Sequence, residues 1–222
     1  MHGGNVTARD DILGRLRSKL GRNAQNAATA RQAMGEVLER HPGGPRPSQP
    51  ADRLAYFRQR SEALSTTIDE VAAFADAPAA VAAYLKRHGL PLAGGVAPGL
   101  SDLPWAEAGL RFEARGGRPD DLVGITGCFC AIAETGTLML CSGHDTPAAL
   151  SLLPETHIAL VRLSRIVAAM EDAWQLARDE LGRLPRAVNF VSGPSRTGDI
   201  EQTIVLGAHG PYRVHLVVIR EA

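Results

Sequence analysis

The stretch that decides the fold spans residues 157–191 and reads HIALVRLSRIVAAMEDAWQLARDELGRLPRAVNFV. Residues 157–163 are apolar almost without a break, which is typical of a strand buried on both faces. A helix is predicted next, capped by Ser164, because apolar side chains recur at helical spacing from Ile166 onward. Residues 187–191 form a second short apolar run and predict another strand. A strand, a helix and a strand in succession indicate an α/β domain with a mainly parallel sheet.

The same alternation continues on both sides of this stretch. Apolar residues at helical spacing predict helices over residues 51–64 and 76–88. Short apolar runs bounded by turn residues predict further strands over 110–114, 122–133, 137–141 and 213–219. These elements belong to one α/β domain, which we expect to cover residues 51–222.

The first 50 residues have a different pattern. Residues 7–20 and 24–40 predict two helices, the first with a capping box between Thr7 and Asp10. Four prolines between positions 42 and 50 cannot continue a helix, so they predict a linker. Residues 1–50 are therefore expected to form a helical arm and a Pro/Gly linker.

Composition limits the class of protein. The chain has 222 residues, of which 45% are hydrophobic and 22% charged, and these are ordinary globular values. Lys+Arg 24 against Asp+Glu 24 gives zero net charge, which argues against a general nucleic-acid or membrane-surface binder. The N-terminal residues lack the apolar core of a signal peptide, so a cytoplasmic location is expected.

A first candidate loop is Glu134-Thr135-Gly136-Thr137, at a turn between two predicted strands. Glu134 is the catalytic candidate, and Thr135, Gly136 and Thr137 are candidates for binding an anion or a substrate. Gly136 permits the backbone to turn, which leaves Glu134 beside two hydroxyl groups. Two interpretations stay open. The carboxylate of Glu134 faces a substrate or another subunit, or it accepts hydrogen bonds from nearby backbone N–H groups.

A second loop follows the predicted strand 187–191 and is expected to begin a short helix. Its free backbone N–H groups and hydroxyls suit an anion, and the planar fork of Arg196 matches a carboxylate or a phosphate. The alternative is a capped helix start in which Arg196 pairs with Asp199 or Glu201. The candidate residues of this loop are Ser192, Gly193, Ser195, Arg196, Thr197 and Asp199.

His209 lies in a tight turn before the last predicted strand. A histidine can titrate near neutral pH, so His209 is a further candidate for anion or substrate binding. A purely structural role in the turn is the alternative. The seven histidines of the chain do not form a recognisable Ser/His/Asp arrangement.

The three cysteines Cys128, Cys130 and Cys141 argue against a disulfide framework, because their number is odd. Together with His144 they make a possible four-ligand metal set, and ordinary core packing is the alternative. Hairpin register bears on this choice. A two-residue turn at 135–136 sets Cys130 opposite Cys141, whereas a three-residue turn puts Cys141 on the other face.

No cysteine run of the ferredoxin type is present, and neither a Walker loop nor a Gly-x-Gly-x-x-Gly run after a strand is found. The sequence therefore predicts no metal and no cofactor bound by this chain itself.

Three separate motifs carry a family resemblance. They are GITG at 124–127 with AIAETGTL at 131–138, SLLPETHI at 151–158, and SGPSRTGDIE at 192–201 with HGP at 209–211. Their order and spacing resemble the lactate-utilisation (LUD) domain family over about residues 51–220. The chain length and the helical arm resemble the small C subunit of that family.

The resemblance implies a fold and a function. The fold is expected to be a Rossmann-like α/β sheet similar to the sugar-phosphate isomerase and CoA-transferase group (NagB/RpiA/CoA transferase-like). The function is expected to be the oxidation of L-lactate to pyruvate alongside iron–sulfur subunits. One alternative is a free-standing transferase or isomerase with Glu134 as base or nucleophile and Arg196 as anion clamp. Another is a regulatory domain that binds a small carboxylate.

Overall fold

The structure is a computed structural model that describes residues 7–200, 203–207 and 209–221, with 198–200 and 203–205 described by their backbone alone. The chain divides into two compact units, Met1–Arg46 and Pro47–Ala222. The division into an arm over 1–50 and a domain over 51–222 stays a prediction.

The first unit contains helices α1 (Ala8–Lys19) and α2 (Ala27–Arg40). The predicted capping box is confirmed: the Asp10 backbone N–H donates to Thr7 Oγ1 and the Thr7 backbone N–H donates to the Asp10 carboxylate. Neither helix has a buried residue, and Ile12, Leu16, Met34, Val37 and Leu38 are exposed.

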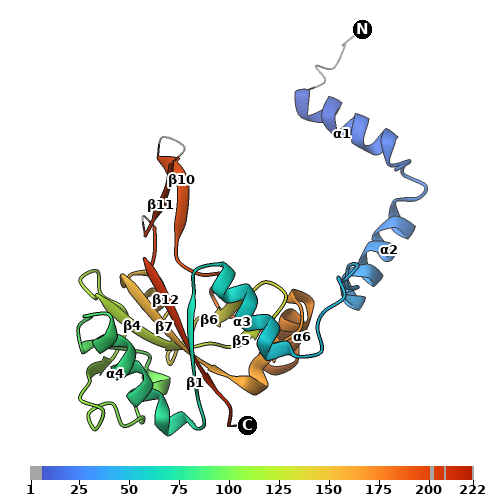
Figure 1. The fold of residues 1–222 in the computed structure, drawn as a ribbon. Helices are drawn as coiled ribbons and strands as arrows, with labels where there is room; N and C mark the ends of the chain where they lie inside the picture. Colours follow the sequence, from blue (N-terminus) through green and yellow to red (C-terminus); the bar gives the residue numbers. More distant parts are fainter. Residues whose placement is uncertain (1–6, 201–202, 208, 222) are drawn as a thin grey trace. The chain divides into compact units, whose positions relative to one another are not determined.

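The second unit is built from helices and strands that alternate along the chain (Figure 1). Its helices are α3 (Arg53–Ala63), α4 (Ala77–Arg87), α5 (Ala149–Leu152) and α6 (Met170–Leu181), with 3-10 turns η1 (Phe74–Asp76), η2 (Pro98–Leu100) and η3 (Leu163–Arg165). Its strands are β1 (Thr67–Val71), β2 (Ala93–Val96), β3 (Arg111–Ala114), β4 (Val123–Gly127), β5 (Cys130–Ile132), β6 (Thr137–Cys141), β7 (Thr156–Arg162), β8 (Ile166–Val167), β9 (Val188–Val191), β10 (Arg196–Ile200), β11 (Thr203–Leu206) and β12 (Arg213–Ile219).

Six strands form a parallel sheet in the order β1-β12-β7-β4-β2-β3. A second sheet has the order β8-β5-β6-β9, and β10 pairs with β11 in a hairpin of its own. The predicted α/β class with a mainly parallel sheet is confirmed. The more specific fold group named above stays a prediction.

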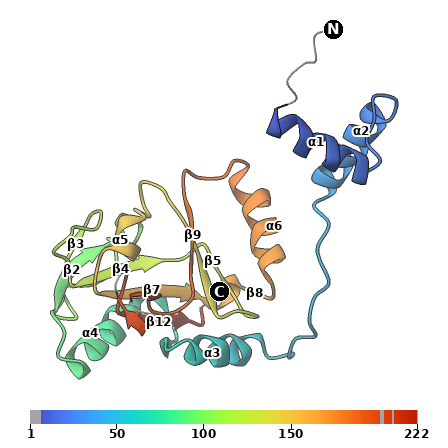
Figure 2. The ribbon, with the colours of Figure 1, turned by 90° about the horizontal axis from the view of Figure 1, so that it is seen from above.

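The elements stack in layers (Figure 2). Alternate residues of the central strands point to opposite faces, so β7 sends Ile158 and Leu160 towards α4 and sends Ala159 and Val161 towards the second sheet. The far face of the second sheet packs on α6 through a separate apolar cluster that includes Cys130. The order of layers is α4, parallel sheet, second sheet, α6.

The helix predicted from Ser164 begins later than expected, and this prediction is wrong. Ile166 and Val167 form strand β8, which pairs with Ala131 and Ile132 of β5. Helix α6 begins only at Met170, because the backbone at 166–167 is already held by the second sheet.

The predicted hairpin registers are also wrong. Ile132 pairs with Thr137 across β5 and β6, so four residues form the turn and Cys130 lies opposite Met139. The turn is longer than expected because the backbone N–H of Ala133 donates to Val167 at the end of β8 and that of Glu134 donates to Ala168, instead of across the hairpin.

The segment from residue 187 to residue 200 differs from the prediction in two respects. Strand β9 is a strand as predicted, but it pairs antiparallel with β6 and does not join the parallel sheet. The expected short helix after it is absent over the described residues 196–200, which form strand β10. Backbone pairing with β11 supplies hydrogen-bond partners for the N–H and C=O groups of this segment, in place of helical hydrogen bonds.

Candidate functional site

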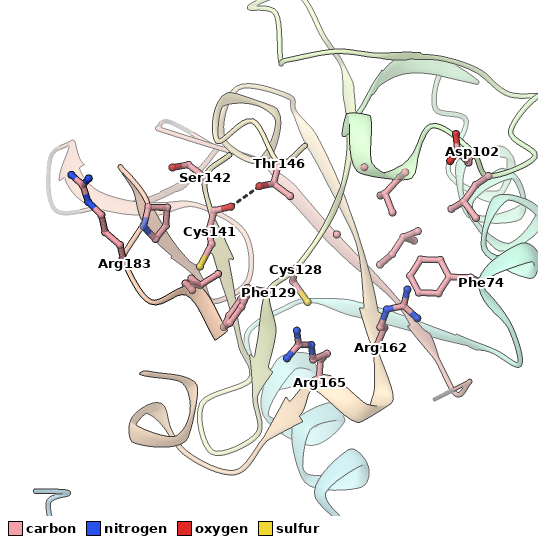
Figure 3. A pocket seen from close by; sticks show the side chains of 17 residues that line it. Phe74, Asp102, Cys128, Phe129, Cys141, Ser142, Thr146, Arg162, Arg165 and Arg183 are labelled. Carbon is pink, nitrogen blue, oxygen red and sulfur yellow. Dashed lines mark hydrogen bonds between the residues drawn. The ribbon is translucent and has the colours of Figure 1, made fainter. Parts of the chain in front are cut away.

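A cavity lies at the carboxyl edge of the parallel sheet, where ligands of open α/β sheets usually bind. Its volume is about 620 Å³. Gly127 ends β4, Arg162 ends β7, Phe74 follows β1, and Leu100 follows β2. Because these strands are parallel, their carboxyl ends converge on one place, and side chains far apart in the sequence line one cavity (Figure 3).

Two arginines give the cavity its positive charge on this side. Arg162 lies over the ring of Phe74, 4.0 Å from the guanidinium carbon to the ring centroid. Arg165 lies over the ring of Phe129 at 5.2 Å. A third arginine, Arg183, also lines the cavity. Such a set of planar, always charged groups suits a carboxylate or a phosphate.

The two arginines differ in their partners. Arg165 donates two hydrogen bonds to the two carboxylate oxygens of Glu180, at 2.6 and 2.7 Å. This pairing raises the pKa of the Arg165 guanidinium and lowers the pKa of the Glu180 carboxyl. Among the described residues, Arg162 has no carboxylate within 4.0 Å. Arg162 therefore keeps its charge available to a ligand.

Two of the three cysteines also line the cavity. Cys128 and Cys141 are half-buried there, whereas Cys130 is buried with its Sγ 3.8 Å from Met139 Sδ. Burial raises the pKa of the Cys128 and Cys141 thiols, so both stay protonated at neutral pH.

The structure does not assemble the metal-ligand set considered for these cysteines. Cys130 faces the core, and the exposed His144 pairs with Asp145 at 2.9 Å. Within the part of the chain that the structure describes, no group of three or more His, Cys, Asp and Glu side chains is placed to hold a metal ion.

The predicted site residue Glu134 lies away from this cavity. Its Oε1 accepts a hydrogen bond from the Met170 backbone N–H at 3.1 Å, and its Oε2 accepts one from Gln49 Nε2 at 3.3 Å. Glu134 therefore caps the first turn of α6. A backbone N–H is the partner expected under the second interpretation given above, in which Glu134 accepts hydrogen bonds from nearby backbone groups.

The other residues of the two loops meet in part. Thr137 Oγ1 and Ser192 Oγ are 2.7 Å apart, so the Glu134 turn and the second loop touch. Arg196 donates to the Leu64 carbonyl at 3.1 Å and to Ser65 Oγ at 2.7 Å, just after α3.

Two glycines of these loops contact α3 through backbone. Gly136 has a φ of +63°, and a Cβ added there would lie 2.5 Å from the Ser61 backbone nitrogen. Gly193 has a φ of +76°, and its Cβ would lie 2.4 Å from the Leu64 carbonyl oxygen. The two motifs thus dock on the same end of one helix.

The remaining predicted residues have varied positions. The Thr135 side chain is buried at Oγ1 without a hydrogen-bond partner, and Thr197 pairs across the hairpin with Val205. The Ser195 backbone N–H donates to the Pro211 carbonyl at 2.9 Å. His209 is exposed, and the side chain of Asp199 and all of Glu201 lie outside the described residues.

Sequence reasoning missed Arg162 and Arg165. Arg162 falls within the predicted strand 157–163 and Arg165 within the predicted helix after Ser164, so neither is expected at a site. The available signal was a pair of arginines directly after a long buried strand, which is the position that a parallel sheet gives to ligand-binding residues.

The fold and the cavity together define an α/β protein with an arginine-lined pocket at the edge of its sheet. Residues 23–219 match the family described as the LUD domain, and the chain belongs to that family. The resemblance seen in the three motifs is thereby confirmed.

The regions that align with curated relatives are only part of those proteins. "Lactate utilization protein C" of Shouchella clausii (strain KSM-K16) is 41% identical over 99 residues, which are 44% of this chain and 43% of that protein. The protein of the same name from Bacillus subtilis (strain 168) is 37% identical over 102 residues, 45% of this chain and 42% of that protein. The matches thus span less than half the length of these relatives.

A solved structure is similar over more of the chain. The crystal structure of a DUF162 family protein from Deinococcus radiodurans has a TM-score of 0.59 and 26% identity, covering 78% of this chain and 100% of that chain. Its likeness agrees with the α/β fold. None of the described helices of the present chain is both long and apolar enough to span a membrane.

Proposed function

We propose that this chain is a subunit of a system that oxidises L-lactate to pyruvate, with iron–sulfur subunits as its partners. Its task is to bind the small carboxylate at the cavity of the sheet edge. Family membership and the name of the relatives, lactate utilization protein C, support a place in lactate utilisation. The cytoplasmic location stays a prediction.

The observation that carries the proposal is the state of Arg162. Its guanidinium lines the cavity, and among the described residues no carboxylate lies within 4.0 Å of it, although Asp102 lines the same cavity. The neighbouring Arg165 is instead neutralised by Glu180. A small carboxylate that enters the cavity supplies Arg162 with the charge-assisted hydrogen bonds that the protein leaves unmade.

The need for partners follows from the cysteine inventory. Oxidation of lactate removes two electrons, and a ferredoxin-type cluster takes four cysteine ligands. The chain has three cysteines, and the Sγ of one of them lies in the core beside Met139. We therefore assign the clusters to partner subunits and leave this chain the binding of the substrate.

The two loops that contain Glu134 and Arg196 remain a second candidate surface. Ser192 and Arg196 are exposed, and the planar charge of Arg196 suits an acidic side chain of a partner. We propose that this surface, with His209 nearby in sequence, contacts another subunit or a small carboxylate.

Calorimetric titration of L-lactate and pyruvate tests the proposed carboxylate site. Arg162→Ala is expected to weaken binding by roughly ten- to a hundredfold, because a charge-assisted hydrogen bond is lost. Arg162→Lys should retain only part of the wild-type affinity, since Lys cannot bind a carboxylate bidentately. Arg60→Ala removes an exposed arginine outside the cavity and is the matched control. Equal binding by wild type and Arg162→Ala contradicts the proposed site.

Isolation of the chain from its native cell tests the partners. Co-purification with proteins that show the visible absorbance of iron–sulfur clusters is the expected result. Recovery of the chain with no such partner, together with lactate oxidation by the chain alone, contradicts a subunit role.

A further inference from the structure

The size of the cavity exceeds what lactate needs. Lactate has six non-hydrogen atoms and occupies roughly 120 Å³, about the share of four water molecules in the liquid. The cavity holds about 620 Å³. Sites for ligands of 20 or more atoms have volumes of roughly 300–1,000 Å³. A bound lactate therefore leaves most of the cavity unfilled.

The walls of the cavity are mostly apolar and include two aromatic rings, and Asp102 is the carboxylate that lines it. Phe74 comes from the turn after β1 and Phe129 from the segment after β4, and Figure 3 draws them on either side of Cys128. Leu103 and Leu160 add aliphatic surface to the same cavity. Apolar walls with a few placed charges are typical of sites for organic ligands with an apolar body.

Each ring is paired with an arginine. Arg162 lies over Phe74 and Arg165 over Phe129, so each positive charge lies beside an aromatic face. A ligand that joins an anionic group to a flat ring meets both features at once. Its anion reaches Arg162, and its ring packs on the phenylalanines.

We propose that the cavity binds an organic anion whose body is a ring or a similarly broad apolar group, held between Phe74 and Phe129. The inference rests on the proposed function in one respect, the use of Arg162 as the anion partner. It extends that function from lactate to anions with larger bodies, and the anionic group is either a carboxylate or a phosphate.

The test compares ligands that share an anionic group and differ in the ring. L-lactate and L-3-phenyllactate have the same hydroxy acid head, and the second carries a phenyl ring. Inorganic phosphate and FMN form the corresponding phosphate pair. Each ring-bearing ligand is expected to bind roughly ten- to a hundredfold tighter than its ring-free partner, because its ring leaves water.

Variants then locate the ring. Phe129→Leu and Phe74→Leu should weaken the ring-bearing ligand roughly three- to tenfold more than they weaken L-lactate or phosphate. Phe190→Leu alters an exposed phenylalanine that packs on Trp174, away from the cavity, and is the matched control. Circular dichroism of every variant confirms that it is folded.

The outcomes separate the two proposals. Tight binding of phenyllactate or FMN that both phenylalanine variants weaken supports the inference, even where lactate itself does not bind and the lactate function fails. Lactate binding that depends on Arg162, without any gain from a ring in either pair, overturns the inference and leaves the proposed function intact. Equal weakening of ring-bearing and ring-free ligands by Phe129→Leu also overturns it.

Discussion

Gly136 and Gly193 show how single residues hold the two loop motifs on α3. Both have a positive φ, and both approach the helix backbone so closely that a methyl group has no room. A left-handed backbone costs a non-glycine residue roughly 1–2 kcal/mol, and the contact with the helix adds to that. The motif glycines are thus explained by the docking of backbone on backbone.

Gly136→Ala is expected to lower the free energy of unfolding by more than about 2 kcal/mol, through backbone strain and displacement of α3. Urea titration measures it. The control is Gly182→Ala, which has a similar φ of +61° but nothing within 4 Å of the added Cβ, and so should lose only about 1 kcal/mol. Equal losses in both variants would show that contact with α3 is unimportant.

The buried side chain of His157 is expected to make the stability of the protein depend on pH. Its side chain is fully buried, Nε2 lies 2.8 Å from Thr126 Oγ1, and Nδ1 has no hydrogen-bond partner. Burial lowers the pKa of His157 to about 4, below its ordinary value of 6.5. The unfolded chain therefore binds the proton first, so stability is complete above pH 6.5 and falls as the pH drops towards 4.

Between pH 7 and pH 5 this one histidine should remove about 2 kcal/mol of stability. The buried His215, whose pKa burial also lowers to about 4, acts in the same window. We expect urea titrations at the two pH values to show a smaller loss in His157→Gln than in wild type. His144→Gln alters an exposed histidine and should keep the full loss. An unchanged pH dependence in His157→Gln would contradict a neutral buried His157.

At the scale of elements, helix α6 depends on carboxylates from two places. The Ala169 backbone N–H donates to the Asp172 carboxylate at 3.0 Å, and the Met170 N–H donates to Glu134. Negative charge at a helix N-terminus also interacts favourably with the helix dipole. Glu134 therefore links the turn after β5 to the start of α6.

Glu134→Ala is expected to lower stability by about 1 kcal/mol, within a range of roughly 0.5–2 kcal/mol for lost helix caps. Thermal or urea unfolding measures the change. Asp179→Ala, which removes an exposed carboxylate further along α6, should lose less than about 0.5 kcal/mol. If Glu134→Ala leaves stability unchanged but abolishes turnover in the assembled system, Glu134 acts in catalysis and its capping role is minor.

The elements also show what the sequence can predict. Strands β7 and β12 are buried apolar runs, and their positions follow from that pattern alone. Strands β1 and β2 do not show this pattern, because β1 is a sheet-edge strand with polar residues at three of its five positions and β2 contains Gly94 and Gly95.

Sheet partners and the cavity are harder to predict than element type. Strand β9 is recognisable as a strand, yet its partner β6 lies about fifty residues earlier, and no local pattern encodes that choice. The same limit hides the cavity, since Phe74 and Phe129 converge only through the order of the parallel strands. The capping box at Thr7 was predictable because it needs only four consecutive residues.

At the scale of the whole molecule, the first unit is distinct in composition. Residues 1–46 carry 8 basic and 4 acidic side chains, and residues 47–222 carry 16 and 20. Helices α1 and α2 contribute no buried residue. Stability of the second unit therefore rests on its own three apolar clusters.

Removal of residues 1–46 should change the free energy of unfolding of the remaining chain by less than about 1 kcal/mol, because no buried apolar surface is lost with α1 and α2. Urea titration of a monomeric sample of both forms measures it. The shortened chain keeps Gln49, which bonds Glu134, so the cap of α6 stays intact. A loss of many kcal/mol would place the arm in the core.

The isolated whole chain is expected not to reduce a redox dye in the presence of L-lactate. Its three cysteines are too few for a four-cysteine cluster of its own. The measurement is dye bleaching by the pure, metal-free protein, with the native complex as the positive control. Lactate-dependent bleaching by this chain alone would contradict the proposal that the redox centres belong to partner subunits.

The position of β12 has a consequence for biosynthesis. This strand lies between β1 and β7, pairs with both, and is made after every other strand of the sheet. In a nascent chain β1 and β7 therefore lack the strand that lies between them until β12 has been synthesised. Contacts that join distant parts of a chain form slowly, and unpaired strand edges attract other chains. During synthesis the facing edges of β1 and β7 are thus expected to need protection by chaperones until β12 pairs with both of them.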